Sequence, residues 1–377
     1  DDIFARLNFP ASTTDDNGEH IWIVSAPSHR FDIAIEADLI EEISRVFGYN
    51  NLPTRTPVAS LSMSKKAETE LSLNRVRDHL VGRGYFEAIT YSFVDTAMQA
   101  VLDPGQAPVA LANPLSAEMG VMRTSIWPGL VKSLIYNVNR QQPRVRLFET
   151  GLCFSQLPDQ DELVFENISQ IKKLAGVICG PRQDENWSND PQPVDFFDIK
   201  GDIESLLALT GQAERFQFVA QPHPALHSGQ SAAIQKDGET VGYVGLLDPR
   251  IQQQLDIRLP IFLFELTVDA VIAKKLAHSE PMSRFPEVRR DIAVIVDQTA
   301  TAAALRGCIA AAAADTLKNL KLFDVYQGKG IDPNRKSLAI GLTFQHASRT
   351  LTDDEINSSV DKIVTSLEAQ FGASLRN

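Results

Sequence analysis

Five carboxylates lie close together in the segment RFDIAIEADLIEEISRVFGYNNLP, which begins at Arg30. The five acids are Asp32, Glu36, Asp38, Glu41 and Glu42. A helix turns by about 100° per residue, so Asp38, Glu41 and Glu42 would gather on one side of it and the apolar residues on the other. Those apolar residues are Ile35, Leu39, Ile43 and Val46. The pattern predicts an amphipathic helix with one core face and one acidic face.

Two kinds of chemistry are open to the acidic face. In the first, the face lies in water, and Glu41 and Glu42 each pair with Arg45 for about 0.2–0.5 kcal/mol. In the second, carboxylate oxygens bind a magnesium ion, which prefers oxygen ligands. The ligands would then be Asp32, Asp38, Glu41 and Glu42. The residue pattern alone favours the first interpretation, because runs of charge usually face water.

The composition is that of a globular protein with two or three domains, since 44% of its 377 residues are hydrophobic and 22% are charged. No apolar run approaches the roughly 20 residues of a membrane span. The three cysteines, Cys153, Cys179 and Cys308, lie far apart in apolar runs, which indicates reduced thiols in the cytoplasm. The chain starts without Met, in a stretch that is no signal peptide, so we expect a carboxyl-terminal piece of a longer protein.

The charge of the chain is unevenly distributed. The net charge of −12 argues against wholesale binding of nucleic acid, and the acidic helix argues against a DNA partner. From Ser283 onward, however, there are 12 Lys and Arg against 11 Asp and Glu, which is +1 and leaves −13 on the remainder. Only the last part of the chain is therefore suited to a polyanion.

Hydrophobic periodicity divides the chain into three parts. In residues 1–57 it predicts a helix (3–7), a strand (20–24) and the acidic helix (35–47), followed by a Pro-containing linker. In residues 65–275 it predicts helices at 71–80, 127–139 and 198–211, strands at 83–93, 144–154, 172–180 and 261–268, and a hairpin at 231–247. Such hairpin-joined strands favour a mostly antiparallel sheet with helices on it, which is an α+β fold.

The third part, residues 283–377, has a distinct order of elements. Strands are predicted at 291–296, 320–326 and 337–345, with a short one from Ala373, and helices at 302–314 and 353–371. This is the βαββαβ order of the ferredoxin-like fold. Thr352 and Glu355 have the spacing of a capping box at the start of the second helix.

Taken together, five stretches resemble one family, the β subunits of bacterial phenylalanyl-tRNA synthetase, over the whole chain. The stretches are PSHRFDIAIEADLIEEISRVFGYNNLP, RGYFEAITYSF, NPLSAEMGVMRTSIWPGLVKSLIYNVNRQQPRVRLFETGLCF, SRFPEVRRDIAVIVD and FDVYQGKGIDPNRKSLAIGLTFQHASRTLTDDEI. The resemblance implies a winged-helix-like module at 1–57, a class II synthetase-like domain without an active site at 65–275, and an anticodon-binding ferredoxin-fold domain at 283–377.

The resemblance also implies partners and cofactors. The chain would belong to an α2β2 tetramer that attaches phenylalanine to tRNA(Phe), with ATP bound on the α subunit. It would support that active site and bind tRNA, with no membrane partner. In the family the acidic cluster is a magnesium site near the α subunit, and the matching residues here are Asp32, Asp38, Glu41 and Glu42. The resemblance thus raises the weight of the magnesium interpretation.

The middle part offers few residues for catalysis. The stretches MRTSIWPGL and VRLFETG resemble a faded ATP-binding motif, with Arg123 and Glu149 as its candidates. A buried ion pair is the favoured interpretation of these two, because no second glycine-rich motif accompanies them. His79, His223 and His227 are interpreted as packing or surface residues, and GRG at 82–84 and HSGQSA at 227–232 as turns. We therefore expect no catalytic residue.

The last part supplies cations and rings that suit an RNA loop. Cations contact the RNA backbone and aromatic rings stack on unpaired bases. The candidates are Arg284, Phe285, Arg289, Arg290, Lys321, Tyr326, Lys329, Arg335 and Arg349. For each one, a solvated surface charge or a core aromatic is an equally good interpretation, and Arg349 has the alternative of only fixing its loop.

Two functional hypotheses remain open at this point. The first is a subunit of the tRNA-charging ligase, silent in catalysis by itself. The second is a free-standing, synthetase-derived protein that binds RNA or regulates without an α partner. The missing start Met favours the first.

Overall fold

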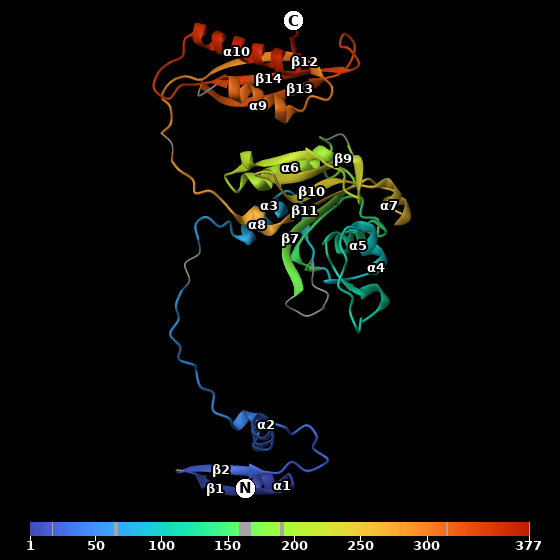
Figure 1. Ribbon diagram of the computed structural model, residues 1–377, viewed down its shortest axis with the longest axis vertical. Coiled ribbons are helices and arrows are strands. Elements are labelled where there is room, and N and C mark those ends of the chain that lie inside the picture. The colour runs from blue at the N-terminus through green and yellow to red at the C-terminus, as the bar shows by residue number, and fades with distance from the viewer. Residues whose placement is uncertain are drawn as a thin grey trace. The chain divides into compact units, whose positions relative to one another are not determined.

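The computed structural model describes residues 1–16, 18–63, 67–157, 167–188, 192–279, 281–313 and 316–376. The chain divides into two compact units, Asp1–Ala67 and Glu68–Asn377 (Figure 1). Three positions at the predicted boundaries, Lys65, Ala314 and Asn377, lie outside the described residues. Helices and strands both contribute to each unit, which confirms a mixed α+β architecture.

The first unit combines a helix, a hairpin and the acidic helix. Helix α1 (Asp2–Arg6) precedes strands β1 (Ala11–Asp16) and β2 (Glu19–Val24), which pair antiparallel, and α2 (Glu36–Phe47) follows. Phe4 and Phe9 are the buried apolar residues of this unit. Strand β1 was not predicted, because its sequence, ASTTDD, has no apolar alternation. The acidic helix is confirmed, and Gly48 follows it with φ of 97°.

A seven-stranded sheet forms the centre of the second unit. Its strand order is β3-β6-β7-β11-β10-β9-β8. The strands are β3 (Phe86–Glu87), β6 (Val145–Gln156), β7 (Ile168–Cys179), β11 (Ile261–Thr267), β10 (Glu239–Leu247), β9 (Leu226–Lys236) and β8 (Phe216–Ala220). Only the pairing of β3 with β6 is parallel among the described strand pairs of this sheet. The prediction of a mostly antiparallel sheet is confirmed.

Helices cover both faces of this sheet, as Figure 1 shows. One core lies under α3 (Leu73–Gly82), α6 (Phe196–Ala208) and α8 (Val268–Ile272). The other lies under α4 (Thr96–Leu102), α5 (Trp127–Val138) and α7 (Pro249–Gln254). Because side chains alternate along a strand, β7 gives Leu174 and Ile178 to the first core and Ala175 and Val177 to the second. A strand covered on both faces reads as an unbroken apolar run.

Two local predictions in this region are wrong. Residues 83–93 do not form one strand: β3 ends at Glu87, and β4 (Phe93–Val94) pairs with β5 (Val121–Met122) in a separate small sheet. The chain turns between them because the N–H and hydroxyl of Thr90 both donate to Glu149. HSGQSA lies inside β9 rather than in a turn. The Asp-Gly hairpin is confirmed, and both turn residues have positive φ, as a type I′ turn requires.

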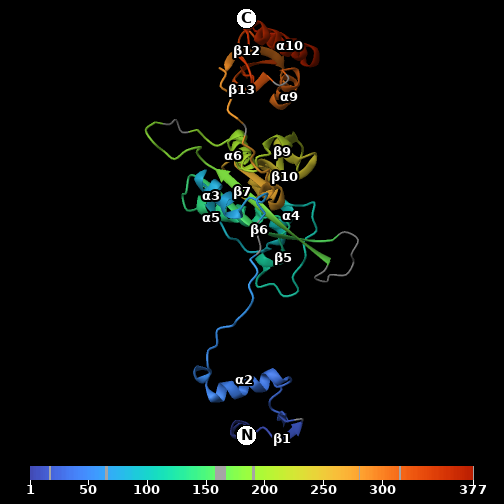
Figure 2. The same ribbon diagram turned by 90° about the vertical axis from the view of Figure 1, so that its left-hand side faces the viewer.

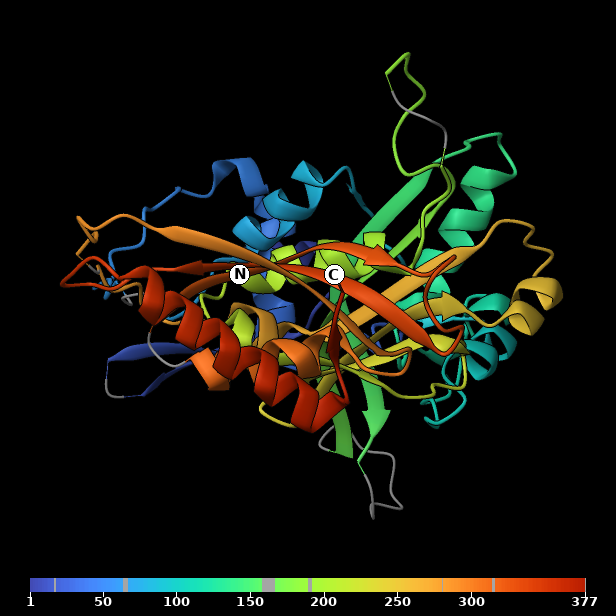
Figure 3. The ribbon, with the colours of Figure 1, turned by 90° about the horizontal axis from the view of Figure 1, so that it is seen from above.

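The last sheet has the order β13-β14-β12-β15, and the βαββαβ prediction is confirmed. Its elements are β12 (Val288–Asp297), α9 (Ala302–Ala313), β13 (Leu317–Tyr326), β14 (Arg335–Phe344), α10 (Asp353–Phe371) and β15 (Ser374–Leu375). Figure 2 shows α9 and α10 on the same side of the sheet, and Figure 3 shows α10 running beside its strands. The Thr352–Glu355 capping box is present. One face of the sheet is therefore core, and the other is open.

The prediction of unpaired cysteines is confirmed. Cys153, Cys179 and Cys308 are free and buried. No helix in the described ranges has both the length and the hydropathy to cross a membrane.

Close packing of β7 against β11 predicts that Gly176 cannot be enlarged. A Cβ there would lie 2.3 Å from Cε1 of Phe264, so Gly176→Ala should lower the free energy of unfolding by about 1–3 kcal/mol. The matched control is Gly201→Ala in α6, where a Cβ meets nothing within 4 Å and should stabilise by about 0.5–1 kcal/mol. Urea unfolding measures both. Equal changes in the two variants would contradict the packing described.

Candidate metal, catalytic and RNA-binding sites

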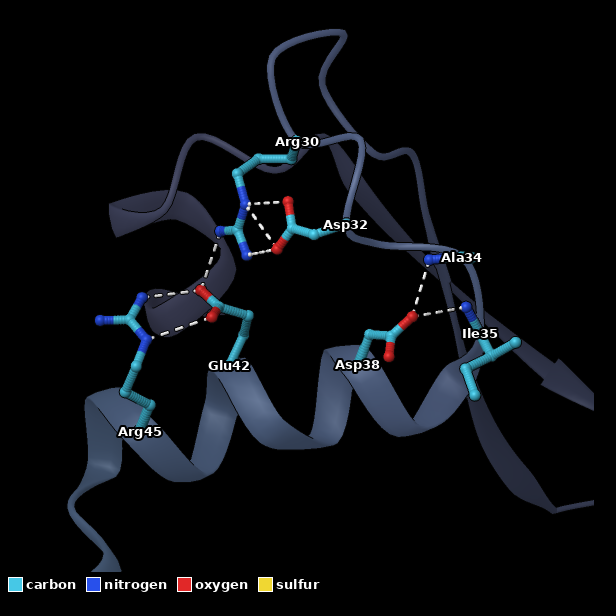
Figure 4. A network of polar contacts seen from close by, with 7 residues as sticks. All are labelled: Arg30, Asp32, Ala34, Ile35, Asp38, Glu42 and Arg45. Carbon is cyan, nitrogen blue, oxygen red and sulfur yellow. Dashed lines mark hydrogen bonds and ion pairs between the residues drawn. The ribbon is translucent and has the colours of Figure 1, made fainter. Parts of the chain in front are cut away.

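In the acidic segment an arginine lies between two of the four predicted metal ligands (Figure 4). Arg30 donates to Asp32 through Nη2 at 2.6 Å and through Nε at 2.9 Å, and its Nη1 donates to Glu42 at 3.0 Å. Arg45 also donates to Glu42, with Nη2 at 2.7 Å from Oε2. The guanidinium of Arg30 lies 5.4 Å from the ring centroid of Phe9. Arg30 thus joins the loop before α2 to the middle of that helix.

The other two predicted ligands, Asp38 and Glu41, have different surroundings. Asp38 accepts hydrogen bonds from the backbone N–H groups of Ala34 and Ile35, at 2.7 and 2.8 Å, and so caps the start of α2. These N–H donors lower the pKa of Asp38. Glu41 is exposed. Figure 4 shows Asp38 turned toward the amino-terminal end of α2, away from Glu42.

The arrangement does not fit a magnesium ion. Among the described residues, no group of three or more His, Cys, Asp or Glu side chains is placed to hold a metal. Hydrogen bonds from Arg30 hold the pKa of Asp32 at about 2, and those from Arg45 and Arg30 hold the pKa of Glu42 at about 2. Both carboxylates are thus already neutralised by a cation of the protein. In this arrangement the four acids do not form a magnesium cage, and the predicted site stays a prediction.

A buried ion pair occupies the faded motif of the central sheet. Arg123 and Glu149 are 2% and 3% exposed, and Nη1 of Arg123 lies 2.7 Å from Oε1 of Glu149. Arg123 also donates to the carbonyl of Leu152 at 2.9 Å and to the hydroxyl of Thr90 at 3.1 Å. Nε and Nη1 of Arg123 and both carboxylate oxygens of Glu149 are therefore hydrogen-bonded inside the protein. The interpretation as a structural ion pair is confirmed.

Two further carboxylates, Glu265 on the central sheet and Asp202 on a helix that covers it, are also paired with cations. Lys173 on β7 lies 2.6 Å from Glu265 on β11, and Glu265 also accepts from Ser125 and from the N–H of Ile126 at the start of α5. Asp202 of α6 receives a second set of donors at 2.6–2.8 Å. These donors are Arg83, Tyr85 and Arg146. The pairs tie helices to the sheet and leave no free cation for a phosphate at these positions.

The histidines have structural contacts, as predicted. His79 shares a hydrogen bond of 2.9 Å with Ser205, and His227 accepts from the N–H of Gly229. His223 packs between the rings of Trp127 and Tyr243.

Most of the predicted RNA-binding arginines have partners within the last domain. Arg289 pairs with Asp291, and Arg290 reaches Asp353 at the start of α10 at 2.7 Å. Arg349 donates to Glu355 at 2.7 Å and so supports the capping box. Arg335 donates to the carbonyls of two neighbouring segments. These contacts favour the local structural interpretation for Arg290, Arg335 and Arg349.

Three other cations are more available. Arg284, Lys321 and Lys329 are exposed, and within the described ranges none has an ion pair. Phe285 is half-buried, and the Tyr326 ring is covered by Arg376, whose guanidinium lies 4.9 Å from the ring centroid. Both predicted stacking rings are therefore partly occupied.

Sequence reasoning missed the ring with the best placement for stacking. Phe323 is 47% exposed on the open face of the last sheet, and the guanidinium of Arg289 lies 5.4 Å from its centroid. The signal was available, because Leu320 and Leu322 pack against the core and the intervening Lys321 must face outward. The same alternation places Phe323 on the open side, just where the register with β14 shifts between Leu322 and Asp324.

The Arg30 contacts predict that α2 loses its attachment when this side chain loses its charge. In Arg30→Met, backbone amides of α2 should exchange hydrogen faster, because Asp32 and Glu42 are left as neighbouring carboxylates with one fewer cation. Arg6→Met, which removes an exposed pair 3.8 Å long, is the control. Hydrogen exchange read by mass spectrometry on residues 36–47 measures the effect. Equal exchange in both variants would show that the contacts of Arg30 with Asp32 and Glu42 do not hold α2 in place.

Acid should have a similar effect on α2. The folded-state pKa values of Asp32 and Glu42 lie at about 2, below their ordinary values of 3.8 and 4.5. Their stabilising contribution is thus complete above the ordinary values and is lost as the pH falls through about 2. Amide protection in α2, which compares the exchange rate with that of an unstructured peptide at the same pH, should therefore fall across that window in the unsubstituted chain, and Arg30→Met should show a smaller fall.

The Arg123–Glu149 pair predicts strong non-additivity. Arg123→Met alone should cost about 3–5 kcal/mol of unfolding free energy, because it leaves the carboxylate of Glu149 buried without its cation. The double variant Arg123→Met with Glu149→Gln should cost clearly less than the sum of the single costs, because it leaves no buried charge. Denaturant unfolding of the four chains measures this coupling. Additive costs would show that the pair is not a unit.

Known proteins resemble the chain over its length. Three family models match in sequence: the tRNA synthetase B5 domain over residues 1–49, the phenylalanyl tRNA synthetase beta chain CLM domain over 52–268, and the ferredoxin-fold anticodon binding domain over 283–376. The phenylalanine–tRNA ligase beta subunit of Pseudomonas fluorescens Pf-5 is 50% identical over 97% of this chain and 45% of its own length.

Other curated relatives give the same picture. The beta subunit of Pseudomonas putida is 50% identical over 98% of this chain, and that of Colwellia psychrerythraea is 46% identical over 100% of it. Both matches cover 46% of the relative, so the chain spans about half the length of the curated relatives it matches. The CLM model alone covers more than half of the chain. The chain belongs to the phenylalanyl-tRNA synthetase beta chain family.

Proposed function

We propose that this chain is the carboxyl-terminal part of the beta subunit of a phenylalanine–tRNA ligase, which attaches phenylalanine to tRNA(Phe) with ATP. The observation that carries the proposal is the identity of 50% with named beta subunits over 97% of the chain. The order of the three matched domains supports it as well. In this proposal the chain contributes no catalytic residue.

The finer architecture belongs to the same proposal. Residues 1–57 would form a winged-helix-like module, 65–275 a class II synthetase-like core without an active site, and 283–377 the anticodon-binding domain. The internal pairing of Arg123, Lys173 and Arg146 supports the silent core, because cations paired inside a sheet are not free to clamp ATP phosphates. ATP would act on the α subunit of an α2β2 tetramer in the cytoplasm, with Mg²⁺ alongside.

An exposed apolar patch supports the α partner. Phe86, Ile89 and Tyr91 are 72%, 93% and 67% exposed, and they lie within six residues of one another. Large apolar side chains that cluster in water mark a surface for another protein. The hydroxyl of Thr90, in the same stretch, donates a hydrogen bond to Glu149 and accepts one from Arg123. The buried ion pair would thus shape the surface that meets the α subunit rather than act on a substrate.

The tRNA partner would meet the open face of the last sheet. Lys321 and Phe323 project from β13 on that face, beside Arg289 of β12. A cation for the phosphates and a ring for an unpaired base are the elements that single-stranded RNA loops need. Arg290 is less suited, because it is engaged by Asp353.

The proposal predicts that the chain alone forms no phenylalanyl-adenylate. With phenylalanine, ATP and labelled pyrophosphate, exchange should stay at the level of a blank, because the paired cations leave no phosphate clamp. A catalytic phenylalanine–tRNA ligase under the same conditions is the positive control. Exchange by the isolated chain that depends on phenylalanine would contradict the proposal.

The open face predicts which substitutions weaken RNA binding. Lys321→Ala should weaken binding of the tRNA(Phe) anticodon stem-loop and of a loop-scrambled version alike, and lower the salt slope by about 1. Phe323→Ala should change the preference between the two loops, because stacking depends on the base. Lys362→Ala, on the exposed side of α10, is the control for charge. Fluorescence anisotropy at several salt concentrations measures these effects. An equal loss of affinity in the Lys362→Ala variant would show that the RNA does not bind specifically at the open face.

A further inference from the structure

A cavity of about 410 Å³ opens on the central sheet, beside the start of α5, and the proposed function does not use it. Strands β6, β7, β10 and β11 form its floor, and the loop after α4 forms one wall. This volume lies within the range of sites that hold small molecules, about 300–1,000 Å³. The kind of molecule that it suits can be derived from the charges and rings that line it.

The charges in the cavity do not balance. Lys173 and Glu265 neutralise each other, with Nζ 2.6 Å from Oε2. Asp103 receives one hydrogen bond of 2.5 Å, from the hydroxyl of Thr124, and within the described ranges it has no ion pair. Burial raises the pKa of Asp103, which is the expected response of a carboxylate that lacks a cation. The cavity therefore has one uncompensated acid.

Aromatic rings line the same cavity. The ring centroid of His223 lies 5.2 Å from that of Trp127 and 4.8 Å from that of Tyr243, and all three residues face the cavity. Nδ1 of His223 accepts from the N–H of Ala225 at 3.2 Å, so the imidazole is neutral with its proton on Nε2. Burial also lowers the pKa of His223. His223 therefore supplies a ring and a donor, and no positive charge for Asp103.

A lone carboxylate beside aromatic rings is the usual setting for an organic cation. The ammonium group pairs with the acid, and the rings attract the same charge and bury the apolar remainder of the ligand. An anion would meet Asp103 and Glu265. Lys173 is the one Lys or Arg among the described residues that line the cavity, and it is already shared with Glu265 and the carbonyl of Thr124. A magnesium ion would find one free carboxylate, which is too few ligands.

We propose that this cavity binds a small organic cation, a primary amine with an aromatic or apolar body, whose ammonium group pairs with Asp103 while its body packs against Trp127 and Tyr243. The site is separate from the surfaces assigned to the α subunit and to tRNA. It gives the central domain a binding function that needs no catalysis.

The test uses the full chain and two probes of matched shape and opposite charge. 2-Phenylethylamine should bind, and 3-phenylpropionate should not, when each is titrated by isothermal calorimetry at neutral pH. Asp103→Asn should weaken binding of the amine by about tenfold to a hundredfold, because it removes the charge-assisted hydrogen bond. Glu204→Gln, an exposed substitution on α6, should leave binding unchanged.

Three results would overturn the proposal: no binding of the amine, equal binding of the anionic probe, or unchanged binding by a folded Asp103→Asn variant. The comparison of the two probes on the unsubstituted chain decides the question even if that variant does not fold. Asp103→Glu, which keeps the charge, should retain more affinity for the amine than Asp103→Asn, and the reverse order would also contradict the pairing.

Discussion

The central sheet is covered by helices on both faces, so a charge placed on it has to be paired inside the protein. Removing an ion from water costs several kcal/mol, and only a close partner with good hydrogen bonds offsets that cost. Arg123 with Glu149, and Lys173 with Glu265, meet this condition at 2.7 and 2.6 Å. Each pair also fixes a chain segment: the first holds Thr90, and the second holds the start of α5 at Ile126.

The same constraint separates the surfaces of the protein by function. Where both sides are covered, the paired charges Arg123–Glu149 and Lys173–Glu265 hold the fold. The last sheet has one open face, and there Lys321 and Phe323 are exposed. The acidic segment is intermediate between the covered sheet and the open one. It lies near the surface, and yet Arg30 neutralises Asp32 and Glu42 there. Asp103 is the exception, because its half-buried carboxylate has no ion pair among the described residues.

Sequence reasoning was most successful where local pattern and final structure coincide. The helices at α2, α5 and α10 and the Asp-Gly hairpin follow from periodicity, caps and turn chemistry. It failed where a distant partner decides the conformation. Thr90 breaks a strand-like run because Glu149, from another strand, binds its N–H. β1 forms because β2 pairs with it, although its own sequence is polar. Propensity carries no information about such partners.

The candidate sites show the same limit. The sequence placed four acids on one short segment, but only the structure shows that Arg30 contacts both Asp32 and, twelve residues away, Glu42, and that Asp38 serves as a cap. Family resemblance, rather than residue chemistry, identified the protein, and it could not rank the cations of the last sheet. The pairing state of Asp103 is a property of the folded chain, whereas the outward face of Phe323 could have been predicted from the alternation of β13.

The central claim is that the charged residues of the middle domain hold the structure and that the chemistry takes place on the partner subunit. The most direct measurement is pyrophosphate exchange by the complex of this chain with an α subunit, carrying Glu149→Gln and normalised to the amount of assembled complex. The account predicts an unchanged kcat for each assembled complex, with any loss confined to the yield of assembly. A folded, fully assembled complex whose kcat has fallen by orders of magnitude would contradict it and would place Glu149 in the catalytic machinery.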